Sequence, residues 1–321
     1  MAEHVRLRPV DAAQVTIIVD NSIDLLLPST DVARRPPANW DLFARRDQLR
    51  AEHGLSLLLT IHADGRSETV LYDAGLGPDT ALHNMDVLGI TPSDFRAMVL
   101  SHGHIDHHGG LDGLFRRLGH HRMPLVLHPD AWRERKLAFP TGHEIHMPPP
   151  SRQDLDREGW EVLEERKPSF LLDGTVLVTG QVERVTEFER GMPLQQTWVN
   201  GSWEPDAWVW DDQAIVVHVK DRGLVVLTGC SHAGVINVLR HARGVTGVDS
   251  VHAVIGGLHL TGSIFEPIIP DTLDALDAIQ PDVIVAGHCT GWKAMQQIAA
   301  RLPHAYIPSS VGTQLWFGAQ I

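Results

Sequence analysis

The chain has 321 residues, of which 43% are hydrophobic, and this is enough for one large core, so we predict a single domain over residues 1–321. Its formal net charge of −13 argues against a nucleic-acid partner and against attraction to an anionic membrane. The N-terminal residues lack the apolar core of a signal peptide, and no apolar run approaches the roughly twenty residues that cross a bilayer. We therefore expect a cytoplasmic protein with no membrane partner.

The first 130 residues predict sheet strands that alternate with helices. Apolar runs, several of them rich in β-branched residues, predict strands at 15–19, 55–61, 69–71, 97–100 and 124–128. The second and third of these runs flank Asp64-Gly65 and predict a hairpin. Helices are expected at 78–88 and 111–118, on either side of the strand 97–100.

Residues 101–110 read Ser-His-Gly-His-Ile-Asp-His-His-Gly-Gly and follow the strand 97–100 directly. The segment places four side chains of metal-ligand type within six positions: His102, His104, Asp106 and His107. Imidazole nitrogens and carboxylate oxygens bind Zn²⁺, Fe²⁺ or Mn²⁺, and His102 and His104 would face the same way while Asp106 and His107 could reach a second ion. The alternative is a solvated histidine-rich loop or a purification tag. The internal position, the aspartate and the flanking glycines favour the metal site.

Residues from about 130 to 210 are rich in proline, charge and tryptophan, and we expect an irregular insertion with one hairpin near 170–180. Trp198, Trp203, Trp208 and Trp210 lie close together within it. Long loops often cover an active site, so these rings could stack on a planar ligand. The alternative is that they pack the insertion onto the body of the protein.

The last third again alternates strands with helices. Strands are expected at 214–219, 224–227, 251–255 and 283–286, and helices at 234–242, 272–279 and 293–301. Two halves of this kind, each a sheet covered by helices, predict an α/β fold with four αββα layers. The loops at the strand ends would gather at one edge of the two sheets.

Three of these later strands end in polar segments flanked by glycine: Gly229-Cys230-Ser231-His232, Gly256-Gly257-Leu258-His259 and Gly287-His288-Cys289-Thr290-Gly291. One histidine after a strand is usually structural, but three in the same topological position indicate convergence on the cleft of the 102–107 cluster. The two cysteines are too few for a disulfide framework. We favour a packing role for Cys289, whereas Cys230 is equally a candidate metal ligand.

These motifs resemble the metallo-β-lactamase fold superfamily, whose His-x-His-x-Asp-His signature stands at 102–107. The Cys-Ser-His, Gly-Gly-Leu-His-Leu and Gly-His-Cys-Thr-Gly segments, with Glu-His-Gly-Leu-Ser at 52–56, resemble its 7,8-dihydropterin-6-methyl-4-(β-D-ribofuranosyl)aminobenzene-5'-phosphate synthase-like subgroup. The resemblance covers most of the chain outside 130–210. It implies the αββα sandwich and a binuclear metal site at one sheet edge.

The resemblance also implies a role for each matching residue. His102 and His104 would hold the first ion, Asp106 and His107 the second, and His288 would complete the second site. Asp73 matches an aspartate expected to accept a hydrogen bond from a ligand imidazole and so fix its tautomer. His53 and Asn21 fall at early strand ends and are candidate substrate contacts.

The chain departs from the common pattern in two places. The stretch 211–213 contains no histidine where many members carry a first-site ligand, and Cys230 stands where many carry a bridging aspartate. We predict that His232 supplies the missing first-site ligand and that Cys230 contacts the second ion or supports its ligands. If His232 pointed away, the site would be weak and would hold one ion.

The resemblance and the residues together predict a metal-dependent hydrolase, or a transferase that displaces diphosphate, with two divalent ions, Zn²⁺ first and Fe or Mn as alternatives. The substrate would be a phosphorylated, pterin-like small molecule. Asp106 would ligate and orient the nucleophile, and His259 would transfer a proton or contact phosphate unless it only forms a structural hydrogen bond. The free N–H groups of the helix that opens at Ser231–Gly234 would favour an anionic substrate group.

Two other readings remain open from the sequence. The same site would serve a lactone, thioester or phosphodiester hydrolase, because a fold does not fix its substrate. The second hypothesis is that the protein is not an enzyme but a non-catalytic, metal-dependent ligand sensor. The sequence also leaves the oligomeric state open, a homo-oligomer included.

Overall fold

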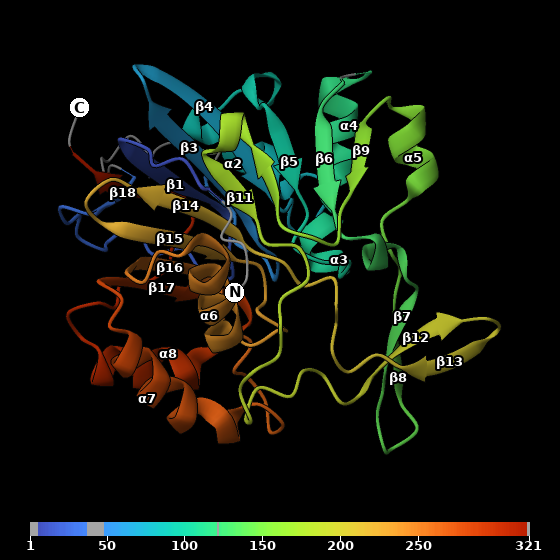
Figure 1. Cartoon of the computed structure of the whole chain (residues 1–321). Helices are drawn as coiled ribbons and strands as arrows, with labels where there is room; N and C mark the ends of the chain where they lie inside the picture. Colours follow the sequence, from blue (N-terminus) through green and yellow to red (C-terminus); the bar gives the residue numbers. More distant parts are fainter. Residues whose placement is uncertain (1–5, 37–47, 121, 320–321) are drawn as a thin grey trace.

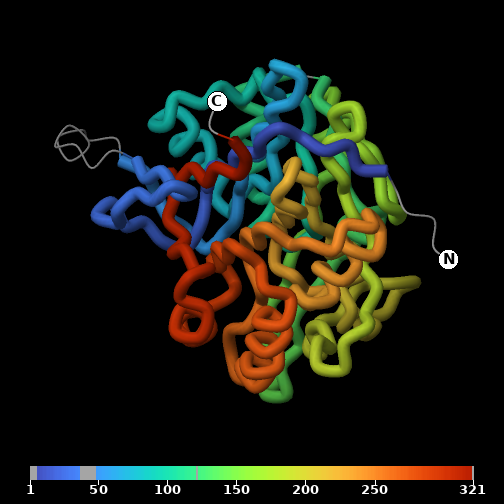
Figure 2. The backbone as a smooth tube through the Cα atoms, turned by 60° about the vertical axis from the view of Figure 1, so that its left-hand side comes forward, coloured from blue at the N-terminus to red at the C-terminus, as the bar shows by residue number. Residues whose placement is uncertain are grey.

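The computed structural model describes residues 6–36, 48–120 and 122–319, and two β-sheets packed face to face form its centre (Figure 1). The first sheet has the strand order β2-β18-β1-β3-β4-β5-β6-β9. Its strands are β1 (Ala12–Val19), β2 (Ala33–Arg34), β3 (Ser56–Ala63), β4 (Arg66–Tyr72), β5 (Ala97–Val99), β6 (Pro124–Leu127), β9 (Glu161–Glu164) and β18 (Gln314–Gly318). Figure 2 shows the red C-terminal segment against the blue N-terminal strands, as this order requires.

The second sheet has the order β10-β11-β14-β15-β16-β17. Its strands are β10 (Ser169–Leu171), β11 (Val176–Val178), β14 (Ile215–Val219), β15 (Gly223–Thr228), β16 (Val251–Gly257) and β17 (Val283–Gly287). The pairs β15–β16 and β16–β17 are parallel, so the carboxyl ends of all three strands lie at the same edge. This edge carries the polar segments that follow the strands.

Apolar side chains fill three layers around the two sheets. The middle layer joins the facing sides of both sheets and includes Val15, Leu57, Val217 and Val225. The outer layers pack the first sheet against α2 (Thr80–Leu88) and α4 (Leu111–Leu118), and the second against α6 (Val235–Thr246), α7 (Ile269–Ile279) and α8 (Trp292–Arg301). The predicted αββα sandwich is therefore confirmed.

Short elements complete the connections. Two are α-helices and five are 3₁₀-helices: α3 (Ile105–His108), α5 (Arg152–Arg157), η1 (Pro92–Asp94), η2 (Pro129–Trp132), η3 (Leu172–Gly174), η4 (Glu266–Ile268) and η5 (His288–Thr290). The predicted β3–β4 hairpin forms around Asp64-Gly65, and both turn residues have positive φ, 52° and 71°, as a two-residue hairpin turn requires. No helix of the described residues is long and apolar enough to cross a membrane.

The stretch 130–210 is more regular than the sequence suggested, which corrects the expectation of an irregular insertion. The strand β9 extends the first sheet, and β10 and β11, the expected hairpin near 170–180, belong to the second. A third sheet, of order β13-β12-β7-β8, projects at the right of Figure 1. It consists of β7 (Arg135–Ala138), β8 (Glu144–Met147), β12 (Gln195–Val199) and β13 (Ser202–Pro205). Strands of four or five residues are too short to show a clear alternation of apolar and polar residues.

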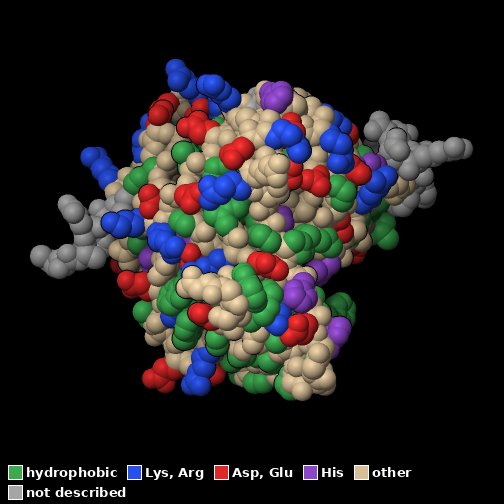
Figure 3. Space-filling view, turned by 90° about the vertical axis from the view of Figure 1, so that its right-hand side faces the viewer, with side chains coloured by type: hydrophobic (Ala, Val, Ile, Leu, Met, Phe, Trp, Pro, Cys, Tyr) green, Lys and Arg blue, Asp and Glu red, His purple; other side chains and the backbone are tan. Residues whose placement is uncertain are grey.

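The surface agrees with the acidic composition. On the face of the molecule in Figure 3, basic and acidic side chains are interspersed and form no continuous basic field.

Candidate metal centre

The predicted ligand residues come together where strands of the two sheets end. The loop after β5 carries His102 and His104 and leads into α3, which carries Asp106, while the loop after β15 carries His232. His288 begins η5 directly after β17. Because parallel strands present their carboxyl ends at a common edge, segments more than a hundred residues apart meet at one place.

Three histidine nitrogens form the first group. His102 Nε2 lies 3.0 Å from His104 Nδ1, and His232 Nε2 lies 3.1 Å from each of them. A tetrahedral zinc ion with bonds of about 2.0–2.1 Å would separate such nitrogens by about 3.3 Å, so the triangle is close to the size of a metal site. All three side chains are buried. Burial is the main cause that lowers the pKa of His102 and His232 well below the ordinary value and that of His104 to about 4, which leaves neutral rings with free lone pairs.

The second group contains Asp106, His107, Cys230 and His288, whose ligand atoms all lie within 4.8 Å of one another. His107 Nε2 is 3.2 Å from Cys230 Sγ, and His288 Nε2 is 3.3 Å from Asp106 Oδ2. The latter contact lacks the alignment of a hydrogen bond, so the buried His288 Nε2 has no hydrogen-bond partner. Burial alone would raise the pKa of Asp106, but His107 and His288 hold it well below its usual range. An unpartnered nitrogen, a carboxylate and a thiol aimed at one point suit a divalent cation.

Asp73 has the place that the resemblance implied. Its Oδ2 lies 2.6 Å from His107 Nδ1, and Ser101 donates to both of its oxygens, from the backbone N–H at 2.7 Å and from the hydroxyl at 2.7 Å. The contact orients His107 Nε2 toward the second group. Burial alone would lower the pKa of His107, but the carboxylates of Asp73 and Asp106 raise it to about 9.

His53 and Asn21 lie on the open side of the second group. His53 Nε2 is 3.6 Å from Asp106 Oδ2, and its side chain is 64% exposed. The Asn21 amide donates to the His288 carbonyl at 3.0 Å and lies 3.4 Å from His53 Nδ1. Both residues are thus within reach of a molecule that approaches Asp106 from solvent.

His259 belongs to a third group, with Cys230 and Cys289, whose ligand atoms also lie within 4.8 Å of one another. Its ring lies tilted against that of His232 with 4.4 Å between centroids, and its buried Nδ1 has no hydrogen-bond partner. The structure therefore places Cys289 beside the predicted metal ligands, although the sequence favoured a packing role for it. The signal was present in the Gly-His-Cys-Thr-Gly segment, where Cys289 directly follows His288.

The N-terminus of α6 is not free, which corrects the expectation of an anion site there. The carboxylate of Glu189 accepts hydrogen bonds from the N–H groups of Ile236 at 2.8 Å and Asn237 at 2.9 Å. Asp212 accepts a third from Ala233 at 2.9 Å. Protein carboxylates already occupy these three N–H groups at the positive helix end, so the groups are not free to bind an anion.

A cavity of about 660 Å³ adjoins the first group. Its lining includes His232 and His259, the aromatic rings of Phe188 and Phe265, and Arg190. None of the four tryptophans of 198–210 lines it, and Trp198 and Trp203 instead pack on each other, with 5.3 Å between ring centroids. Trp198 and Trp208 are 45% and 40% exposed, so these two rings are not buried against the body of the protein.

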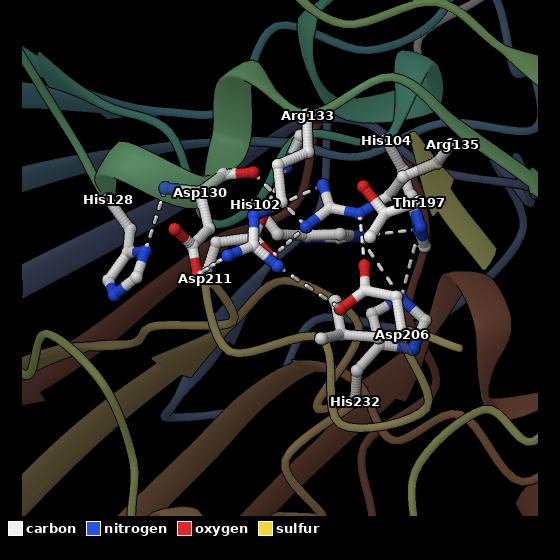
Figure 4. A network of polar contacts seen from close by, with 12 residues as sticks. His102, His104, His128, Asp130, Arg133, Arg135, Thr197, Asp206, Asp211 and His232 are labelled. Carbon is white, nitrogen blue, oxygen red and sulfur yellow. Dashed lines mark hydrogen bonds and ion pairs between the residues drawn. The ribbon is translucent and has the colours of Figure 1, made fainter. Parts of the chain in front are cut away.

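Four buried residues near the first group had no signal in the sequence. Gln195 contacts His104, and Arg135, Asp206 and Asp211 form an ion-pair network beside it (Figure 4). Four of their contacts join positions 71 to 108 residues apart along the chain, without a recurring motif.

Comparisons with known proteins agree with this geometry. A model of the metallo-beta-lactamase superfamily matches residues 50–288. The chain is 30% identical over 251 residues to the 7,8-dihydropterin-6-methyl-4-(beta-D-ribofuranosyl)-aminobenzene-5'-phosphate synthase of Methanocaldococcus jannaschii. The matched region covers 76% of this chain and 83% of the relative. A second protein of that organism is 29% identical over 78% of this chain and 88% of its own length.

Two solved structures share the fold. The first is Tm1679, a metal-dependent hydrolase of the beta-lactamase superfamily, with a TM-score of 0.71 and 23% identity over 94% of this chain and 98% of that one. The second is unliganded yeast PDE1, with a TM-score of 0.53 and 10% identity over 96% of this chain and 100% of that one.

Proposed function

Because the chain belongs to the metallo-β-lactamase superfamily, we propose that it is a metal-dependent enzyme that acts on a phosphorylated, pterin-like small molecule, either by hydrolysis or by displacement of diphosphate. The observation that carries the proposal is the side-by-side arrangement of two ligand groups at the sheet edge, one of three histidines and one of mixed donors. The substrate class is carried over from the printed name of the relative in Methanocaldococcus jannaschii.

The residues present fit two divalent ions. His102, His104 and His232 would hold the first, and Asp106, His107 and His288 would hold the second, with Cys230 as a fourth donor. Nitrogen donors and a thiol favour zinc, and the same set accepts iron or manganese. When bound, such a pair lowers the pKa of a water molecule and polarises a phosphoryl or carbonyl oxygen.

The protein's own side chains would position the reactants and move protons. Asp106 is the member of the second group that lies next to the exposed His53, so its carboxylate would orient the attacking group. His259 lines the cavity with an unpartnered nitrogen and would protonate the leaving group. Asn21 fixes the neighbouring backbone by its hydrogen bond to the His288 carbonyl.

The cavity supports a substrate with a planar apolar part. Phe188 and Phe265 offer ring faces or edges for a pterin-like group, whereas Glu187 and Asp271 in the same lining disfavour a phosphate there. The phosphate would instead face His53 and the ions, on the open side of the second group.

The test is an assay of the metal-loaded protein with a dihydropterin methyl diphosphate, with and without a ribofuranosylaminobenzene phosphate. We expect diphosphate release that is lost in Asp106→Ala. Release that requires the second substrate identifies the transferase, and release without it identifies the hydrolase. Turnover only of lactones, thioesters or simple phosphodiesters would overturn the pterin assignment. Full metal occupancy without turnover on any of these substrates would point to a sensor.

A further inference from the structure

We propose that Gln195 is a positioning residue for the first metal ligand group, and that the small third sheet serves to hold it there. The inference rests on the proposed metal binding by His102, His104 and His232. It assigns a task to β7 and β12, which lie outside both main sheets. It also explains why a buried arginine and two buried aspartates stand next to a histidine cluster.

The first step is the contact between Gln195 and His104. His104 turns Nδ1 toward His102 and His232, and its Nε2 lies 2.7 Å from Gln195 Oε1. An amide oxygen can only accept, so His104 Nε2 must carry the proton and Nδ1 must keep its lone pair. The contact therefore selects the one tautomer of His104 that can bind a metal through Nδ1.

The second step is the orientation of the Gln195 amide itself. Its Nε2 donates to Asp206 Oδ2 at 3.1 Å, so a flipped amide would set its carbonyl oxygen against the Asp206 carboxylate and lose this hydrogen bond. Gln195 is fully buried, so bulk solvent does not reach its oxygen. Asp206 thus fixes which end of the amide faces His104.

The third step is the arginine that holds both aspartates. Arg135 Nε donates to Asp206 Oδ2 at 2.8 Å, and its other face makes a bidentate pair with Asp211, at 2.6 Å and 3.1 Å (Figure 4). Arg135 and Asp211 have no exposed surface. A buried charge network of this kind costs desolvation energy, and it fixes geometry more than it adds stability.

The network closes on the loop that carries the ligands. Asp211 Oδ2 accepts a hydrogen bond from the Gly103 N–H at 2.8 Å, and Gly103 is the residue between His102 and His104. A Cβ at Gly103 would lie 2.3 Å from the Ala131 carbonyl oxygen, so the loop is also packed against η2. The ring of contacts therefore runs from His104 through Gln195, Asp206, Arg135 and Asp211 back to Gly103.

The experiment is a Co²⁺ titration of the metal-free full chain, followed by visible spectroscopy, in wild type and three variants. Gln195→Leu removes the acceptor, Gln195→Glu retains one, and Thr197→Val is the control. Thr197 lies on the same strand, is buried, and donates to the Glu134 carbonyl rather than to the network. Ligand-field bands report both sites, and a thiolate charge-transfer band reports the site with Cys230.

We expect Gln195→Leu to weaken the all-nitrogen site by about 10- to 100-fold and to leave the thiolate band unchanged. Gln195→Glu, whose protonated carboxyl can accept from His104 and donate to Asp206, should restore part of the affinity, and Thr197→Val should match wild type. Equal affinity of both sites in Gln195→Leu and wild type would overturn the inference. A wild type that binds no Co²⁺ would overturn the proposed function instead.

A second measurement does not depend on the fold of a variant. In the metal-free wild type, long-range ¹H–¹⁵N correlation spectra of the imidazoles should show His104 protonated at Nε2. Protonation at Nδ1 would contradict the proposal, even if every Gln195 variant failed to fold.

Discussion

Asp73 Oδ2 and His107 Nδ1 lie 2.6 Å apart, and both side chains are fully buried. The aspartate also accepts two hydrogen bonds from Ser101, the residue that opens the ligand loop, so one carboxylate joins that loop to the second ligand group. The geometry supports a role in which Asp73 holds the His107 tautomer that leaves Nε2 free for an ion.

The first prediction concerns this pair. Asp73→Asn should lower the affinity of the second ion by about 10- to 100-fold, because a neutral amide holds the imidazole less firmly than a carboxylate. Metal titration of the variant checks this. Ser101→Ala, which removes a hydroxyl contact but keeps Asp73 charged, should have a smaller effect. A variant Asp73→Asn with unchanged affinities would show that the pair is only structural.

The same pair predicts how the stability of the metal-free protein depends on alkaline pH. Asp73 and Asp106 raise the pKa of His107 to about 9 in the folded state, against about 6.5 when unfolded. The stabilisation is therefore complete below pH 6.5 and is lost as the pH rises toward 9. Urea unfolding at pH 6.5 and 9 should show the loss in wild type and a smaller one in His107→Gln. Equal pH slopes in the two proteins would contradict the assignment.

The metal-free protein should also lose stability in acid, here because burial of the histidines of the first ligand group opposes their protonation. Burial lowers the pKa of His104 to about 4, so protons bind the unfolded chain first as the pH falls below 6.5. Stability of the metal-free protein should therefore decline between pH 6.5 and 4, and His104→Gln should reduce this slope. Unfolding curves at pH 5 and 6.5 measure it. If the free energy of unfolding of His104→Gln fell with decreasing pH as steeply as that of wild type, His104 would not be the cause of the loss.

Glu189 provides a prediction about stability alone. Glu189→Ala would leave the N–H groups of Ile236 and Asn237 at the start of α6 without their carboxylate partner, at a cost of about 1–3 kcal/mol in the free energy of unfolding. Glu187→Ala, an exposed neighbour, should change it by less than about 0.5 kcal/mol. Chemical denaturation compares the two. Equal free energies of unfolding for both variants would mean that the Glu189 carboxylate does not stabilise α6.

A prediction about catalysis follows from His259. His259→Asn should lower turnover by about 10²- to 10⁴-fold while both ions stay bound, because His259 is proposed as the proton donor and is not needed as a ligand. Activity assays combined with metal analysis on the same samples separate the two effects. Loss of an ion in this variant would instead make His259 a ligand, together with Cys230 and Cys289.

Local patterns were enough to predict most of the fold and much of the site. The segment 101–110 and the glycine-flanked strand ends each carry their signal within a few residues, and the parallel order of β15, β16 and β17 brings them together. His232 was inferred from the missing histidine near Asp211, and the structure places its Nε2 at 3.1 Å from His102 and His104.

The parts that could not be predicted depend on contacts between distant residues. Gln195 meets His104 across 91 positions, and Arg135 meets Asp211 across 76, from strands too short to show a period. Glu189 reaches the helix end from a loop whose sequence resembles any exposed acidic stretch. In such cases tertiary packing decides the role of a residue, and the local sequence gives no signal for that role.

We propose that two adjacent sites hold two ions and that His232 completes the first. The most direct test is the metal content of the purified, metal-reconstituted chain and of His232→Ala, measured by elemental analysis per folded chain. We expect about two ions per chain in wild type and about one in the variant. Two ions in both proteins, or none in wild type, would contradict it.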